Sequence, residues 1–186
     1  FDAILSGAHG IVTTDDDYSA SWQRLPRQRI NVDLPELLDV VAGLAEQPAP
    51  PPDPDFPYVL SAGERRAFTA NTIMRDPSWR KRDVSGDLRL GTADAQALGI
   101  SSGASVRVTT RAGTTEVRVQ VTDAMRGGHI SLPNGFGLTS RGTRTGVAPN
   151  DLTRAQDRDE WVGTPWHKHV PARVEVVAAA AGRTGR

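Results

Sequence analysis

The chain has 186 residues, and its 22 Lys and Arg side chains balance its 22 Asp and Glu side chains, so the formal net charge at pH 7 is zero. A chain of this length can hold one domain with a core and part of another, and its neutrality argues against duplex DNA or an anionic membrane as the main partner. It has no cysteine and only 4 histidines, which excludes disulfides, thiolate metal sites and a cysteine nucleophile.

Residues 1–47 are expected to be the end of a preceding domain, because they carry too few apolar side chains for a core of their own. The absence of a starting methionine also favours a piece of a longer protein. One helix is predicted from about Pro35, with Asn31 or Asp33 as its cap and Pro35 in its first turn. Its apolar side chains recur at helical spacing, at Leu37, Leu38, Val41 and Leu44.

Two segments flank the part that looks like a complete domain. Residues 48–56 are rich in proline and predict an extended linker, and residues 178–186 predict a flexible tail. The first residues lack a secretion signal, and no apolar run reaches the roughly 18 residues of a membrane span. We therefore expect a cytoplasmic protein.

Residues 57–177 show short strands separated by glycine turns, which predicts a mainly β fold closed into a compact barrel. Valines alternate with polar residues in the clearest two strands. Thr92 is expected to cap a short helix that Gly99 ends, and residues 133–149 to form a long glycine-rich loop. The expected strands span residues 58–60, 87–90, 104–110, 114–121, 129–132 and 173–177, and the helix spans 93–98.

The segment after the first strand carries the strongest functional pattern. The strand is expected to break at Ser61-Ala62-Gly63, and the next ten residues are dense in hydrogen-bonding groups. Glycine permits close backbone approach to a ligand, and arginine makes two-point contacts with phosphate. This pattern suits a large, polar, anionic cofactor, and a solvated surface loop is the alternative.

Other patterns in the chain favour structural roles. Gly99 to Gly103 matches the G-x-S-x-G pattern of serine hydrolases, but it follows a predicted helix rather than a strand, so we interpret it as a helix stop and a turn. Residues 75–83 are basic, which favours a solvated face or a domain interface over a nucleic-acid site. The carboxylates Asp157, Asp159 and Glu160 favour turn and capping roles over acid–base catalysis.

Taken in chain order, these segments resemble the C-terminal cofactor-binding domain of the molybdopterin oxidoreductases, the group that includes formate dehydrogenases, nitrate reductases and dimethyl sulfoxide reductase. The first loop is most similar to the formate-dehydrogenase-like branch. The matching segments are LSAGERRAFTANTIMRDP, LGTADAQALGISSGASVRVTTRAGTTEVRVQVTDAMRGGHISLPNGFG, APNDLT and DRDEWVGTPWHKH.

The resemblance implies a six-stranded double-psi β-barrel over residues 57–177 that clamps a molybdopterin guanine dinucleotide, one of two pterins that hold molybdenum or tungsten. Upstream domains of the same enzyme would hold the metal and carry out catalysis, so this segment alone is expected to be inactive, with no catalytic or metal-binding residues. Many relatives have arginine at the position of Glu64, whose carboxylate suits pterin or guanine N–H groups rather than phosphate. The cofactor-binding residues that the resemblance implies are Ala62, Gly63, Glu64, Arg65, Arg66, Asn71, Thr72, Asn134, Asn150, His167 and Lys168.

Two alternatives stay open at this point. One is a double-psi barrel without cofactor that serves as an adaptor or interaction module, in which the implied residues would have no reason to converge. The other is a small hydrolase, which needs a carboxylate within hydrogen-bond reach of a histidine.

Overall fold

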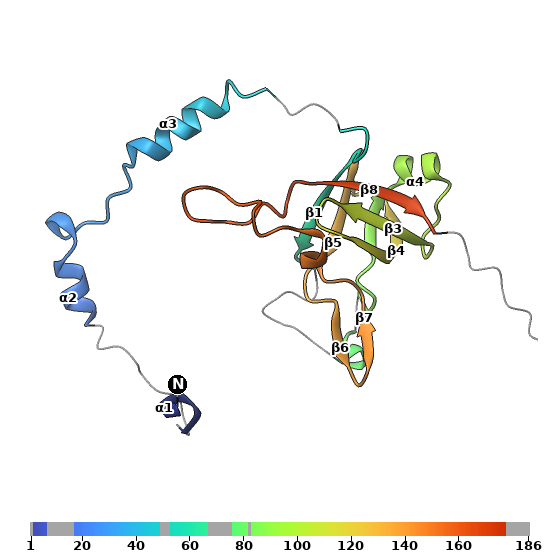
Figure 1. Ribbon diagram of the computed structural model, residues 1–186, viewed down its shortest axis with the longest axis horizontal. Helices are drawn as coiled ribbons and strands as arrows, with labels where there is room; N and C mark the ends of the chain where they lie inside the picture. The colour runs from blue at the N-terminus through green and yellow to red at the C-terminus, as the bar shows by residue number, and fades with distance from the viewer. Residues whose placement is uncertain (1, 7–16, 49–52, 67–75, 82, 178–186) are drawn as a thin grey trace, which may run out of the picture. The chain divides into compact units, whose positions relative to one another are not determined.

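The computed structural model describes residues 2–6, 17–48, 53–66, 76–81 and 83–177. The chain divides into two units, Phe1–Pro50 and Pro51–Arg186. Figure 1 shows helices in the described part of the first unit and the strands in the second.

The described residues of the first unit form three α-helices and one 3-10 helix: α1 (Asp2–Ser6), α2 (Tyr18–Gln23), η1 (Pro26–Gln28) and α3 (Pro35–Leu44). None of the residues of α2, η1 and α3 is buried. The helix predicted from Pro35 is confirmed as α3, but the predicted side-chain cap is wrong, because Leu34 occupies the cap position. Asn31 and Asp33 instead hydrogen-bond to each other, with the Asn31 amide donating to the Asp33 carbonyl at 2.9 Å.

Six strands of the second unit close into a barrel in the order β1-β5-β2-β4-β3-β8. The pairs β1–β5 and β2–β4 are parallel, and the remaining neighbours are antiparallel. The prediction of a mainly β fold with a six-stranded barrel is confirmed. The strands are β1 (Tyr58–Glu64), β2 (Leu88–Gly91), β3 (Ser105–Thr110), β4 (Thr114–Thr122), β5 (His129–Pro133) and β8 (Val170–Val176).

Side chains of the six strands fill the barrel interior, and in β3 and β4 buried residues alternate with exposed or partly exposed ones. Val106 and Val108 of β3 are fully buried, as the alternation predicted, and Leu88 and Leu90 of β2 belong to the same buried core. Burying one such side chain contributes about 1.5–3 kcal/mol to folding relative to leaving it exposed. This packing fixes the direction in which each strand end leaves the barrel.

Helix α4 (Thr92–Leu98) covers one part of the barrel and ends at Gly99, whose backbone φ of +65° is left-handed. The helix stop predicted at this position is confirmed. The predicted cap at Thr92 is wrong, because Gly91 takes the cap position and the Thr92 hydroxyl donates instead to Asp123.

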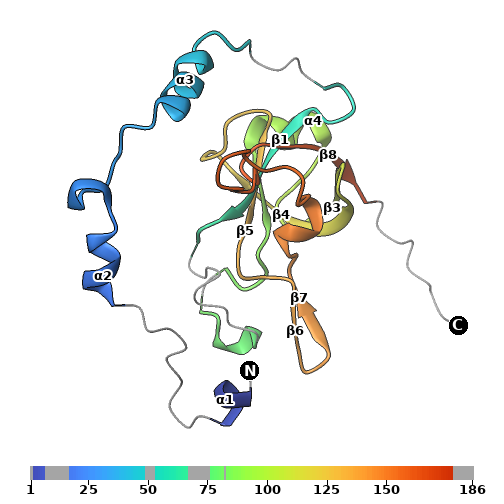
Figure 2. The ribbon, with the colours of Figure 1, turned by 60° about the vertical axis from the view of Figure 1, so that its left-hand side comes forward.

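The long loop predicted for residues 133–149 contains a hairpin of β6 (Leu138–Ser140) and β7 (Thr143–Thr145), followed by the 3-10 helix η4 (Pro149–Leu152). The hairpin extends away from the barrel in Figure 1 and Figure 2. Arg141 and Gly142 form its turn with φ of +48° and +79°. Paired positive φ angles are typical of the tight turns that join two antiparallel strands.

Candidate functional site

The candidate site begins where β1 and β5 end side by side. The two strands run parallel, and their register shifts between Ala62 and Glu64. Gly63 lies at the shift with a backbone φ of +87°, a conformation that glycine adopts at little cost. The predicted break of the strand after Leu60 is wrong, because this irregularity at Gly63 lets β1 continue to Glu64.

Three residues implied by the sequence meet at the backbone carbonyl of Gly63. The side-chain amide of Asn134 donates to this oxygen at 3.0 Å, and the ammonium group of Lys168 donates to it at 3.3 Å. A backbone hydrogen bond connects two of the same segments, because the Ala62 N–H donates to the His167 carbonyl at 2.7 Å. The end of β1, the residue after β5 and the segment before β8 are thereby joined at one point.

The Glu64 carboxylate is already bound by neighbouring side chains. It accepts hydrogen bonds from the Ser131 hydroxyl at 2.6 Å and the Arg66 guanidinium at 2.8 Å, and it pairs with Arg89. Partial burial raises the pKa of Glu64, but the hydrogen bonds from Ser131 and Arg66 and the charges of both arginines outweigh it, so the pKa lies below its ordinary value. Glu64 therefore ties the end of β1 to β2 and β5, and its contact with a cofactor stays a prediction.

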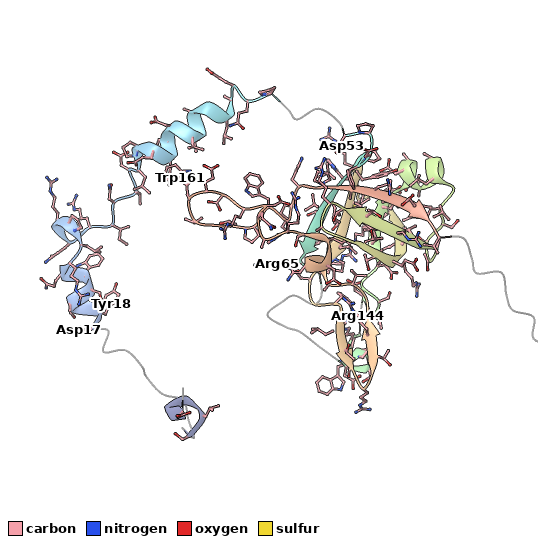
Figure 3. All side chains as sticks on the ribbon, viewed as in Figure 1. Asp17, Tyr18, Asp53, Arg65, Arg144 and Trp161 are labelled. Atoms are coloured by element: carbon pink, nitrogen blue, oxygen red, sulfur yellow. The ribbon has the colours of Figure 1, made fainter. Side chains whose placement is uncertain are left out.

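The two arginines of the first loop have different surroundings. The Arg66 side chain is only 4% exposed and donates to the Asp87 carbonyl at 2.8 Å. Arg65 is exposed, and within the described residues its side chain makes no hydrogen bond or ion pair. Figure 3 shows it beside the end of β1. Of these two described arginines, Arg65 is thus the one with an accessible guanidinium.

A hollow of about 460 Å³ opens beside this end of β1, and Arg65, Arg66 and Arg89 contribute to its lining. Asp83 and Asp87 also line it, and one carboxylate oxygen of each is buried without accepting a hydrogen bond in the described part of the chain. The Asp83 oxygen lies 3.6 Å from the Arg66 guanidinium in an ion pair, so the Asp87 oxygen is the acceptor of the two that has neither a hydrogen bond nor an ion pair among the described residues. Cationic donors and this acceptor in one hollow fit a ligand that carries both anionic groups and N–H groups.

Asn150 is exposed in η4, a 3-10 helix that contacts β1 and β4. The buried Leu152 anchors η4 to the barrel, and Asp151 pairs with Arg144 of β7, which Figure 3 labels. These contacts do not bring Asn150 to the Gly63 carbonyl. Asn71 and Thr72 lie outside the described residues.

Sequence reasoning missed Arg80, which is only 4% exposed. Its guanidinium lies 4.2 Å from the centre of the Phe136 ring and donates to the Gly135 carbonyl at 3.0 Å, and burial lowers its pKa. A solvated face or a domain interface was predicted for residues 75–83. Arg80 is not solvated, because Phe136 and the Gly135 carbonyl replace water around its guanidinium. Arg80 therefore supports the segment that follows Asn134.

Of the three carboxylates near residue 159, Asp159 serves the local turn, as predicted. Asp159 accepts hydrogen bonds from the backbone N–H groups of Trp161, Val162 and Thr164, and these lower its pKa. An ionised carboxylate engaged in this way is unsuited to be a general acid. In the described parts of the chain, no ion pair joins a carboxylate to a histidine, and no group of three or more His, Asp or Glu residues could hold a metal.

Residues 58–171 match the molydopterin dinucleotide binding domain family, and because this match covers more than half of the chain, the chain belongs to that family. Acetylene hydratase from Pelobacter acetylenicus is similar in structure, with a TM-score of 0.55 and 20% sequence identity over 76% of this chain. An identity this low shows likeness of fold alone. This chain covers 20% of the acetylene hydratase chain, about a fifth of its length. No curated protein matched the chain.

Family membership confirms the predicted cofactor, a molybdopterin dinucleotide. The side chains around Gly63 fit this group, because Asn134 offers an amide for a pterin or guanine edge, while Lys168 and Arg65 offer cations for a diphosphate. The buried Asp87 oxygen that accepts no hydrogen bond among the described residues fits its N–H groups. Among the described residues, no helix is long and apolar enough to cross a membrane.

Proposed function

We propose that this chain is the cofactor-clamping C-terminal domain of a molybdenum or tungsten oxidoreductase that holds two molybdopterin guanine dinucleotides. The observation that carries the proposal is the meeting of Asn134 and Lys168 at the Gly63 carbonyl, inside the residues that match the family. A site for a large ligand needs donors from distant segments to be held together before binding.

Each residue at this point has a distinct role in the proposal. Asn134 uses one N–H on Gly63 and keeps its side-chain oxygen and second N–H for a pterin or guanine edge. Lys168 uses one of its three N–H groups on Gly63 and keeps two for a phosphate. In the proposal, Arg65 contacts the diphosphate. Ala62, Gly63 and Glu64 set the backbone conformation at the end of β1, against which the cofactor lies. The remaining proposed contacts are Arg66, Asn71, Thr72, Asn150 and His167.

When bound, the metal–pterin group supplies the redox chemistry, and this chain binds and orients it. We assign metal ligation and substrate chemistry to the rest of a longer polypeptide. This assignment is supported by the coverage of the structural match, because the chain spans about a fifth of the acetylene hydratase chain. The similarity of the first loop to formate dehydrogenases makes formate oxidation or carbon dioxide reduction the first reaction to assay. A cytoplasmic location stays a prediction from the sequence.

The adaptor without cofactor remains the second candidate, because the Glu64 carboxylate forms ion pairs with both Arg66 and Arg89. A loop whose charges are paired in this way needs no ligand for its stability.

Metal and nucleotide analysis of the natural polypeptide distinguishes the two candidates. The proposal expects molybdenum or tungsten near one equivalent, and acid release of about two GMP per metal, since each pterin carries one guanine nucleotide. A protein made in cells that produce the cofactor, yet free of metal and nucleotide, would favour the adaptor.

A further inference from the structure

A second hollow, of about 300 Å³, lies on the outer side of the barrel over β1. Leu60 and Ala62 of β1 point into the buried core, whereas Val59 and Ser61, which alternate with them, line this hollow. On either side of β1 lie its sheet neighbours, β5 and β8. We call this space the β1 flank hollow.

Basic side chains reach the β1 flank hollow from both sides of β1. His129 begins β5 opposite Val59, and Arg126 belongs to the turn just before it. Lys168 and His169 come from the other side, in the segment that leads into β8. No carboxylate of the described residues lines the hollow.

His129 adds an observation that is independent of this charge. Its Nδ1 atom is buried and has no hydrogen-bond partner in the described part of the chain. Leaving a buried polar atom without a partner costs free energy, which a bound ligand can recover. The carboxylate of Asp94, near the turn that holds Arg126, accepts a hydrogen bond from the Gly128 N–H at 2.9 Å.

We propose that the β1 flank hollow binds an oxyanion of the phosphate class. Arg126 and Lys168 supply charge and donors from opposite sides, and the imidazoles of His129 and His169 complete the lining. An arginine and a lysine facing one space without a carboxylate are suited to an anion with several acceptor oxygens. The proposal is argued from this lining, and it shares Lys168 with the proposed clamp.

Calorimetric titration with inorganic phosphate tests the proposal, with the full natural polypeptide in chloride buffer at constant ionic strength. We expect saturable binding at one site. Arg126→Gln should weaken it about tenfold, the effect of losing one charge-assisted hydrogen bond. The matched control is Arg107→Gln, which removes the same charge from an exposed pair with Glu116 on β3 and β4 and should leave phosphate affinity unchanged.

Two preparations identify the source of the oxyanion, one loaded with cofactor and one made in cells that lack the pterin. Binding in both supports a site for free phosphate. Binding in the cofactor-free protein alone supports a site for a phosphate group of the dinucleotide. Absence of binding in both preparations would overturn the proposal, as would equal weakening by Arg126→Gln and Arg107→Gln.

Discussion

The side-chain amide of Asn134 donates a 3.0 Å hydrogen bond to the Gly63 carbonyl, although 71 positions separate the two residues in the sequence. The bond joins the ends of two parallel strands, β1 and β5. Because it uses only one N–H of the amide, the rest of the group keeps its capacity to bind a ligand in a fixed orientation. Asn134 is therefore oriented before any cofactor arrives.

Replacing Gly63 by alanine should disturb this arrangement directly. Gly63 has a positive φ, and an added Cβ would lie 2.9 Å from the Asn134 side-chain oxygen. We expect Gly63→Ala to lower the free energy of unfolding by about 1–2 kcal/mol and to reduce the GMP that acid releases per polypeptide. Denaturant unfolding and nucleotide analysis measure the two effects.

Gly127→Ala is the matched control for this change, because no atom lies within 4 Å of the added Cβ and Gly127 has no positive φ. It should leave both quantities nearly unchanged. Equal effects of the two substitutions would show that the conformation of Gly63 has no special importance.

Glu64 should make stability depend on pH. Its pKa in the folded protein lies below the ordinary value of 4.5, so its contribution is fully present above that value and is lost as the pH falls through the lower, folded pKa. We expect the difference in unfolding free energy between the wild type and Glu64→Gln to be largest above pH 5 and to shrink in acid. Urea unfolding at a series of pH values measures it.

Glu116→Gln serves as the control for Glu64. Glu116 pairs with Arg107 on the surface, where both side chains are about half exposed, and such pairs contribute little to stability. A Glu64→Gln profile as flat as that of Glu116→Gln would contradict the role of Glu64 in tying β1 to its neighbours.

Arg80 should be intolerant even of lysine. The planar guanidinium stacks on Phe136 and donates to the Gly135 carbonyl, and an ammonium group cannot do both in the same geometry. We expect Arg80→Lys to lower the free energy of unfolding by about 1–3 kcal/mol. Arg141→Lys, at a side chain that is 90% exposed, should change it by less than about 0.5 kcal/mol. Similar values for both variants would argue against a supporting role for Arg80.

The barrel strands could be predicted from sequence where one face of the strand is buried and the other is exposed to solvent. Val106 and Val108 alternate with exposed residues, so burial and pattern agree. The β6–β7 hairpin could not be predicted in this way, because its short strands have no buried face and depend on the turn at Arg141 and Gly142. Thr92 resembled a helix cap by residue type, but its hydroxyl donates a hydrogen bond to Asp123, which is distant in sequence.

The candidate site was predicted only in part for a similar reason. The resemblance to the family implied that Gly63, Asn134 and Lys168 contact the cofactor, and the fold brings these three together. The pairing of Glu64 with Arg89 depends on which strands become neighbours, and alternation within a strand does not specify that. The contact of Arg80 with Phe136 depends in the same way on the packing of two segments that are distant in sequence.

The most direct test of the clamp is the guanine nucleotide that the protein retains after prolonged dialysis, compared between the wild type and Lys168→Met. Lys168 is exposed and its ammonium donates to the Gly63 carbonyl, so the substitution removes a cation without opening the core. We expect the wild type to retain about two GMP per metal, and Lys168→Met to lose dinucleotide about tenfold more readily. Arg173→Met, an exposed position paired with Glu175, should match the wild type. Equal retention by all three proteins, or a wild type without nucleotide, would contradict the account.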